Sequence, residues 1–111
     1  MVVKDRRVNE ITVLTVDGEI NFNSSPDFRK AFLRIPDSNL KKVVVNLAGV
    51  DYVDSSGLAT LVEAYQKIKG AGGELILANL SDKVKSLFEI TKLEKLFRVF
   101  QSEEEALRNI G

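Results

Sequence analysis

Cysteine and histidine are both missing from the 111 residues of the chain. The lack of cysteine excludes disulfide bonds, thiolate nucleophiles and zinc–thiolate sites, and it is compatible with a reducing compartment. The lack of histidine excludes Ser-His-Asp and Cys-His catalysis and removes the commonest metal ligand. Most hydrolase chemistry is therefore excluded. We expect a protein that is not an enzyme and that has no cofactor and no metal.

A surplus of charge is also lacking, because 16 Lys and Arg residues balance 16 Asp and Glu residues. Without a basic surplus, the counterion release that drives nucleic-acid binding has no obvious source, so we expect no direct nucleic-acid partner. Apolar runs such as Val43–Val45 are far shorter than the roughly 20 residues that span a bilayer. The N-terminal residues also lack the apolar core of a signal peptide. We expect a cytoplasmic protein with no membrane partner.

The composition is that of a chain that buries a core, since 44% of the residues are hydrophobic and 29% are charged. A length of 111 residues also lies in the range of roughly 100 to 150 residues that is commonest for one domain. We therefore expect a single domain over residues 1–111.

Two periodicities alternate along the chain. Strands are predicted where β-branched and other apolar residues cluster, at Val2–Val8, Ile11–Ile20, Lys42–Leu47 and Glu74–Ala78, with a short apolar segment at Phe97–Phe100. Helices are predicted where apolar residues recur every three or four positions. The first spans Ser25–Ile35 after a cap at Ser24 or Ser25, and the second begins at the segment Asp54–Gly57 and ends at Gly70. The third begins at Ser81 or Asp82 and runs through Phe88, and the fourth runs from Ser102 to Asn109. This order predicts an α/β fold, with a mixed, mostly parallel sheet of about four to five strands covered by about four helices.

The segment Asp54-Ser55-Ser56-Gly57 is the candidate functional site, because it follows a central strand and begins a helix. Ligands of α/β sheets bind at the carboxyl ends of the strands. A phosphate added to a hydroxyl there would face free N–H groups and the positive end of the helix dipole. An ordinary N-cap is the simpler interpretation, since Ser and Asp commonly cap helices. One capping residue suffices, however, so two serines and a glycine exceed what capping needs.

Other chemistry has less support in the sequence. A nucleophile elbow needs the pattern G-x-S-x-G and a base, and both are missing. The glycines between Gly70 and Gly73 follow a helix and precede a strand, the reverse of a phosphate-binding loop, so we expect them to end the helix. Asp51 and Asp54 lack a third ligand for a hard cation and are interpreted as solvated acids. Phe22 is expected in the core, with an exposed anchor for a partner as the alternative.

Several motifs together resemble the STAS domain of anti-sigma factor antagonists, over essentially the whole chain. They are Gly18-Glu19-Ile20, Val43-Val44-Val45-Asn46-Leu47, Asp51, Asp54-Ser55-Ser56-Gly57-Leu58, Gly72-Gly73-Glu74-Leu75, and Val84-Lys85-Ser86-Leu87-Phe88 with Leu93 and Phe97. The resemblance implies a STAS-like fold and a bacterial cytoplasmic protein that binds an anti-sigma factor and so releases a sigma factor for transcription. It also implies that the anti-sigma factor is a serine kinase that phosphorylates the antagonist, with a serine phosphatase as a further partner.

The same resemblance implies roles for particular residues. In such antagonists the serine directly after the aspartate is the phosphoacceptor, and this position is Ser55. The residues expected around the phosphoserine and in contact with the partner are Asp54, Ser56, Gly57, Asn21 and Asn23. The family usually has an acid where this chain has Asn21, so this chain keeps the shape of that side chain but loses its charge.

Two other functions stay open. Related STAS domains are scaffolds of stress complexes, tails of anion transporters and accessories of lipid transport, so the chain could be a subunit that never cycles its serine. A small nucleotide-binding protein is the third possibility, because helix N-termini accept phosphates. The phosphorylatable Ser55 favours the antagonist.

Overall fold

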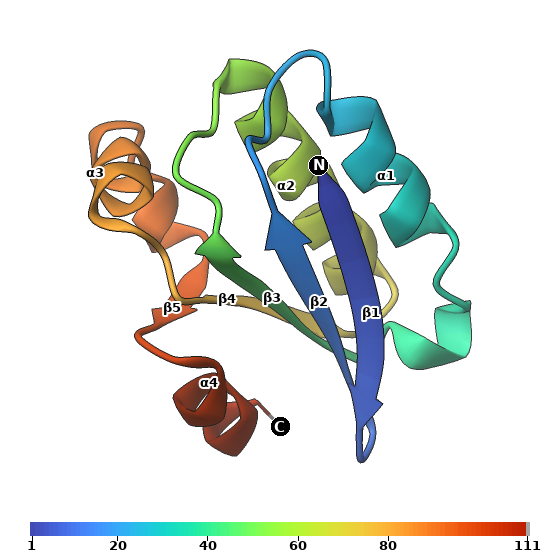
Figure 1. The fold of residues 1–111 in the computed structure, drawn as a ribbon. Helices are drawn as coiled ribbons and strands as arrows, with labels where there is room; N and C mark the ends of the chain where they lie inside the picture. Colours follow the sequence, from blue (N-terminus) through green and yellow to red (C-terminus); the bar gives the residue numbers. More distant parts are fainter. Residues whose placement is uncertain (111) are drawn as a thin grey trace.

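A five-stranded sheet is the framework of the structure, a computed structural model that describes residues 1–110 (Figure 1). The strands lie side by side in chain order and span Val2–Val8 (β1), Ile11–Asp17 (β2), Lys42–Gly49 (β3), Glu74–Ala78 (β4) and Arg98–Phe100 (β5). The α-helices are Ser25–Leu33 (α1), Ser55–Gly70 (α2), Asp82–Ile90 (α3) and Glu103–Asn109 (α4), and two 3₁₀ helices span Asp37–Asn39 and Leu93–Lys95. The predicted α/β fold is confirmed.

The sheet is mixed because only its first pair of strands is antiparallel. β1 and β2 form a hairpin whose turn contains Asn9 at φ 57°, a left-handed conformation that asparagine tolerates. β2, β3, β4 and β5 are parallel to one another. A parallel neighbour needs a crossover connection, which explains why a helix lies between each successive pair of these strands.

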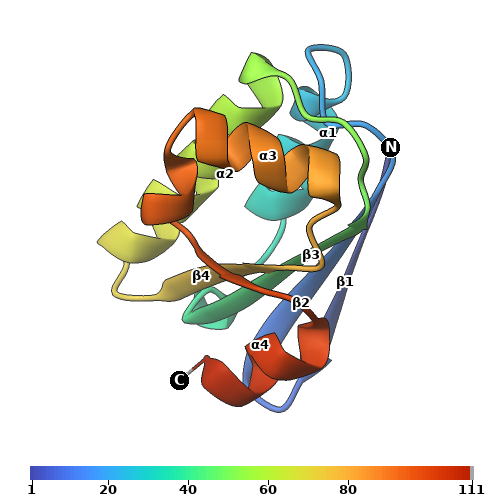
Figure 2. The ribbon, with the colours of Figure 1, turned by 90° about the vertical axis from the view of Figure 1, so that its left-hand side faces the viewer.

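The helices cover the two faces of the sheet unequally (Figure 2). α1, α2 and α3 lie on one face and α4 lies on the other. Each crossover leads to the next strand in the same direction, and right-handed crossovers then place their helices on one face. Along β3, Val43 and Val45 pack toward the three-helix layer and Val44 packs toward α4, and all three are fully buried. This two-sided burial is the reason that β3 is apolar on successive residues.

Three predicted boundaries are wrong by two or three residues. The second strand ends at Asp17 rather than Ile20, because its pairing with β3 shifts register after Thr15 and Gly18 turns the chain at φ +110°. The first helix ends at Leu33 rather than Ile35, since a residue before proline disfavours the helical conformation and Pro36 follows. β3 continues past Leu47 to Gly49.

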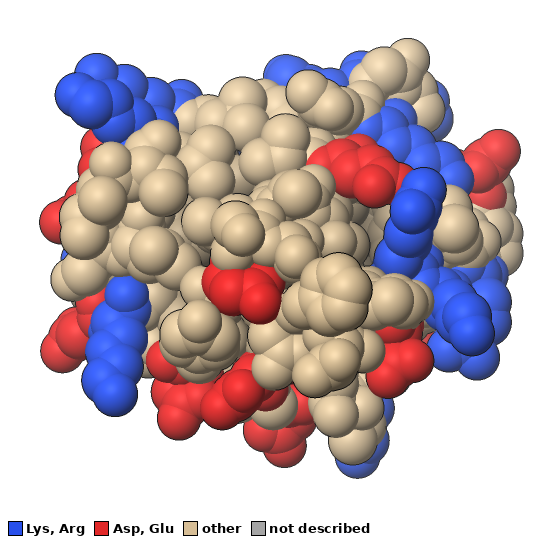
Figure 3. Space-filling view, turned by 90° about the horizontal axis from the view of Figure 1, so that it is seen from above, with Lys and Arg blue, Asp and Glu red and all other residues tan. Residues whose placement is uncertain are grey.

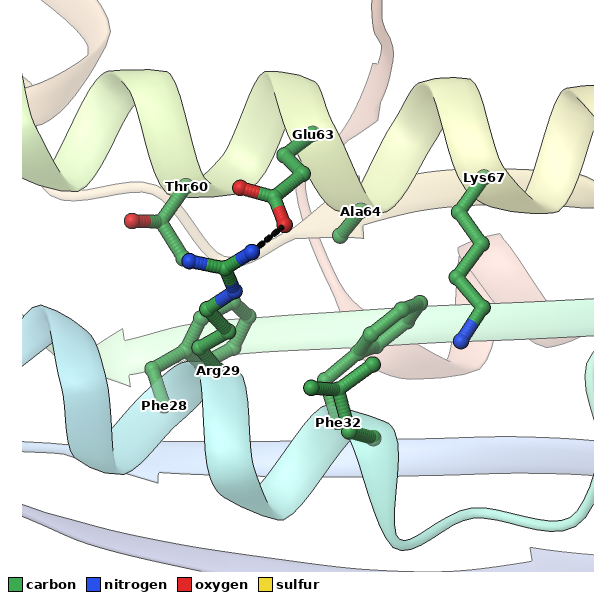
Figure 4. A pocket seen from close by; sticks show the side chains of 8 residues that line it. Phe28, Arg29, Phe32, Thr60, Glu63, Ala64 and Lys67 are labelled. Atoms are coloured by element: carbon green, nitrogen blue, oxygen red, sulfur yellow. Dashed lines mark ion pairs between the residues drawn. The ribbon is translucent and has the colours of Figure 1, made fainter.

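The contact between α1 and α2 is closed at its outer edge (Figure 4). Arg29 of α1 pairs with Glu63 of α2 at 2.9 Å, and the Lys67 ammonium lies 5.8 Å from the centre of the Phe32 ring. The space beneath these side chains is about 20 Å³, which holds a single water molecule at most. This helix pair therefore acts as a packed support for the sheet rather than as a ligand pocket. None of the helices in residues 1–110 combines the length and the apolar character needed to cross a bilayer.

Candidate functional site

The start of α2 lies at the carboxyl ends of β2 and β3, where two loops continue the pairing of these strands. The Gly18 N–H donates to the Gly49 carbonyl at 2.9 Å, and the Ile20 N–H donates to the Tyr52 carbonyl at 3.0 Å. The Asp54 N–H then donates to the Ile20 carbonyl at 3.1 Å. The loop before α1 and the loop before α2 therefore run together as a continuation of the sheet, and they meet at Asp54.

The Asp54 carboxylate joins the two loops. One of its oxygens, Oδ1, accepts the Gly57 N–H at 2.9 Å and so caps α2. The other, Oδ2, accepts the Phe22 N–H at 2.9 Å from the loop before α1. Both oxygens are thus occupied by backbone donors, so Asp54 acts as a structural clamp. Within residues 1–110 no group of three or more acidic residues, around Asp54 or elsewhere, is arranged so that it could hold a metal ion.

The Ser55 hydroxyl does not cap α2, because the Asp54 carboxylate is the cap. Its side chain is exposed, whereas that of Ser56 is half-buried. The Ser55 hydroxyl makes no hydrogen bond to any residue from 1 to 110, and the first turn of α2 contains no acidic residue. The remaining free N–H groups at this helix end and the positive end of the helix dipole favour further negative charge in addition to the Asp54 carboxylate at the cap. The site can therefore accept a phosphate on Ser55 without breaking an existing interaction.

Gly57 is explained by close packing. It is buried, and a Cβ placed on it would meet the Ile20 carbonyl oxygen and would lie 2.8 Å from both the Ile20 Cγ2 and the Val53 Cγ1 atoms. Real Cβ atoms do not approach other atoms so closely. Gly57 therefore lets the first turn of α2 pack closely on the two loops.

Asn21 builds the entry to α1. Its Oδ1 atom accepts the N–H groups of Asn23 and Ser24 at 2.9 and 3.0 Å, and its Nδ2 atom donates to Glu19 at 3.1 Å. Ser24 is the N-cap residue of α1, but the predicted side-chain cap is wrong, since neither the Ser24 nor the Ser25 hydroxyl accepts an N–H of the helix. They donate instead to the carbonyls of Glu19 and Asn21, because the Asn21 turn directs them back toward the loop.

Two aromatic side chains beside Ser55 are exposed. Phe22 is 76% exposed and Tyr52 is 51% exposed, so the expectation that Phe22 lies in the core is wrong. The Asp54 clamp holds the Phe22 backbone at the surface, away from the core that α1 and the sheet fill. Asn23 is exposed next to it. Uncharged residues cover most of this end of the molecule, and Lys and Arg gather toward its margins (Figure 3).

A groove of about 530 Å³ continues from Ser55 between α2 and α3. Leu58 of α2 and Val84 and Leu87 of α3 form apolar parts of its lining, and Lys83 of α3 lies on the same groove as Ser55. Neither Tyr52 nor Lys83 was among the residues that the sequence motifs predict for the site. Tyr52 and Lys83 are far apart in the chain, so the sequence does not indicate that both lie on the same groove as Ser55.

The profile of the STAS domain family matches residues 3–106 of the chain. The chain belongs to this family. A curated relative, the anti-sigma-B factor antagonist of Staphylococcus aureus, is 30% identical over 89 residues, which are 80% of this chain and 82% of that protein. The family named from the sequence motifs is therefore confirmed.

Solved structures show how widely this fold is shared. An anti-sigma factor antagonist from Mycobacterium paratuberculosis superposes with a TM-score of 0.86 at 21% identity, covering 98% of this chain and 92% of that one. A sulfate transporter family protein from Wolinella succinogenes superposes with a TM-score of 0.80 at 18% identity, covering 91% of this chain and 84% of that one. These likenesses establish the STAS-like fold.

Proposed function

We propose that this chain is an anti-sigma factor antagonist that binds an anti-sigma factor kinase, releases a sigma factor and is switched off by phosphorylation of Ser55. The observation that supports this most strongly is the exposed Ser55 hydroxyl, which capping by Asp54 leaves unused at the start of α2. The curated relative named for antagonism of an anti-sigma-B factor supports the partner class. The chain itself is then the substrate, and the ATP chemistry belongs to the kinase. A serine phosphatase reverses the modification.

The partner surface in this proposal is the end of the molecule around Ser55. Phe22 and Tyr52 are its anchors, since exposed aromatic residues are enriched among the residues that dominate binding energy. Asn23 is exposed beside them, and Ser56 lies half-buried behind Ser55. Asn21, Asp54 and Gly57 hold this surface in shape through the contacts described above.

The phosphate acts by blocking this surface directly. It adds about 1.5 to 2 negative charges, which the N-terminus of α2 accommodates with a contribution of roughly 0.3 to 1 kcal/mol, so the fold persists. In a complex the same charge would lie beside Asp51 and Asp54, and burying it unpaired costs several kcal/mol. The switch therefore changes the interface and leaves the domain folded.

A second candidate is a scaffold subunit that never cycles its serine. The likeness to the sulfate transporter family protein favours it, because the same fold occurs there. In that role the partner surface would be occupied permanently and Ser55 would stay unmodified in the cell.

Affinity capture from the native host tests the proposal. We expect the captured partner to be an ATP-binding anti-sigma factor, and we expect the purified chain to displace a sigma factor from it. Capture of transporter or stress-complex subunits, with no displacement of sigma factor by the chain, would support the scaffold instead. The Ser55→Ala variant is the matched control, since it should bind and resist inactivation by ATP.

A further inference from the structure

Lys83 is the one basic residue that lines the groove beside Ser55 within residues 1–110. It lies in the first turn of α3, is exposed and pairs with no acidic residue among those described. The one acidic residue of the groove, Asp54, already accepts two backbone N–H groups. Lys83 therefore has no anionic partner across the groove in the unmodified protein.

We propose that Lys83 binds the phosphate of phosphorylated Ser55, so that the modified side chain bridges α2 and α3. The inference rests on the proposed function for the phosphate, but it adds a residue from another helix to the phosphorylated state. Lysine binds phosphate as a point charge on a flexible stem, which suits a groove whose two walls are separate helices. The titratable groups that line the groove together with Ser55 are Asp54 at the cap, Tyr52 in the preceding loop and Lys83 on α3.

This ion pair lengthens the life of the phosphorylated state. A phosphatase must bind the phosphate in its own site, so the pair with Lys83 has to open first. An ion pair between exposed side chains is typically worth roughly 0.2 to 1 kcal/mol. Because each 1.4 kcal/mol corresponds to a tenfold ratio, we expect removal of Lys83 to speed dephosphorylation by about 1.4- to fivefold.

The test uses the full chain with phosphoserine inserted at position 55 during translation, so that no cognate kinase is needed. The phosphate is titrated by ³¹P NMR, and its removal by a purified serine phosphatase is timed. The variants are Lys83→Gln, Lys83→Arg as the charge-preserving rescue, and Lys85→Gln as the matched control. Lys85 is an exposed lysine of the same helix, but it lines a different depression beside Phe100 and Glu105.

We expect the second pKa of the phosphate to be lower in the wild-type, Lys83→Arg and Lys85→Gln proteins than in Lys83→Gln, because a nearby cation favours the dianion. We also expect faster dephosphorylation in Lys83→Gln alone. The proposal is overturned if the second pKa of the phosphate is the same in the wild-type and Lys83→Gln proteins. It is also overturned if Lys85→Gln changes this pKa as much as Lys83→Gln does. If a cognate kinase fails to label Ser55, the proposed function fails, while the result with the inserted phosphoserine still decides the role of Lys83.

Discussion

The N-termini of α2 and α4 both carry serine, but the two helices use it differently. At α4, the Ser102 hydroxyl is the cap and accepts the Glu105 N–H at 3.1 Å. At α2, Asp54 is the cap and Ser55 is the first helical residue with a free, exposed hydroxyl. Capping by Asp54 therefore leaves the Ser55 hydroxyl unused, whereas the Ser102 hydroxyl is engaged in the cap of α4.

The charge at these two helix ends also differs. The first turn of α4 contains three glutamates, and Glu103 pairs with Arg6 and accepts the Asn46 amide at 3.1 Å. The first turn of α2 contains no acid. Because a helix N-terminus favours negative charge, α4 meets this preference with three glutamates in its first turn, whereas α2 meets it with the Asp54 carboxylate at its cap. The start of α2 therefore carries fewer acidic side chains than the start of α4.

Phosphorylation of Ser55 should lower the affinity for the anti-sigma factor by roughly a hundredfold or more, because the dianion would be buried beside acidic residues. The measurement is the affinity of the unmodified and phosphorylated proteins, with thermal unfolding followed on the same samples. Unchanged affinity would contradict the switch. A loss that appears only because the phosphorylated domain unfolds would contradict the direct block.

Gly57→Ala should lower the free energy of unfolding by about 1 to 3 kcal/mol, since the new methyl group overlaps the Ile20 backbone and the Val53 side chain. Gly70→Ala is the matched control at the other end of the same helix, where a Cβ would meet no atom within 4 Å. It should be neutral or stabilising by up to about 1 kcal/mol. Denaturant unfolding measures both, and equal values for the two variants would refute the close packing at the start of α2.

Phe22→Ala should weaken binding of the anti-sigma factor by about tenfold or more, because truncation of a central aromatic anchor commonly costs over about 1.4 kcal/mol. Ile90→Ala is the matched control, since Ile90 is 78% exposed and Phe22 is 76% exposed, and Ile90 lies at the far end of α3. Titration calorimetry compares the two affinities. A loss in both variants, or in neither, would remove Phe22 from the partner surface.

Ser102→Ala should cost about 1 kcal/mol of stability, the typical loss of a serine cap, whereas Ser55→Ala should change stability by less than about 0.5 kcal/mol. Equilibrium unfolding of the two variants measures this difference. A similar cost at both positions would mean that Ser55 shares the capping of α2.

Much of this architecture could be predicted from local patterns. The apolar run of β3 and the helical stripe that ends at Gly70 depend on neighbouring residues in the chain, and both elements lie where the patterns indicate. The position of Asp54–Gly57 at the end of β3 follows from the same patterns. The family motifs run along these elements, which is why the family could be named from the sequence.

The internal geometry of the site could not be predicted in this way, because it depends on contacts between distant segments. Asp54 reaches Phe22, which is 32 positions away in the chain, and this contact decides that Phe22 is exposed. The need for glycine at position 57 comes from the Ile20 carbonyl, which no pattern around α2 indicates. The sequence indicates which residues begin α2, but it does not indicate which of them caps the helix.

Phosphopeptide mapping of the full chain after incubation with ATP and the anti-sigma factor kinase tests most directly whether capping by Asp54 leaves Ser55 as the acceptor. We predict that the label lies on Ser55, is lost in Ser55→Ala and is retained in Ser56→Ala. Label on Ser56 alone, or label that persists in Ser55→Ala at the original rate, would contradict this assignment.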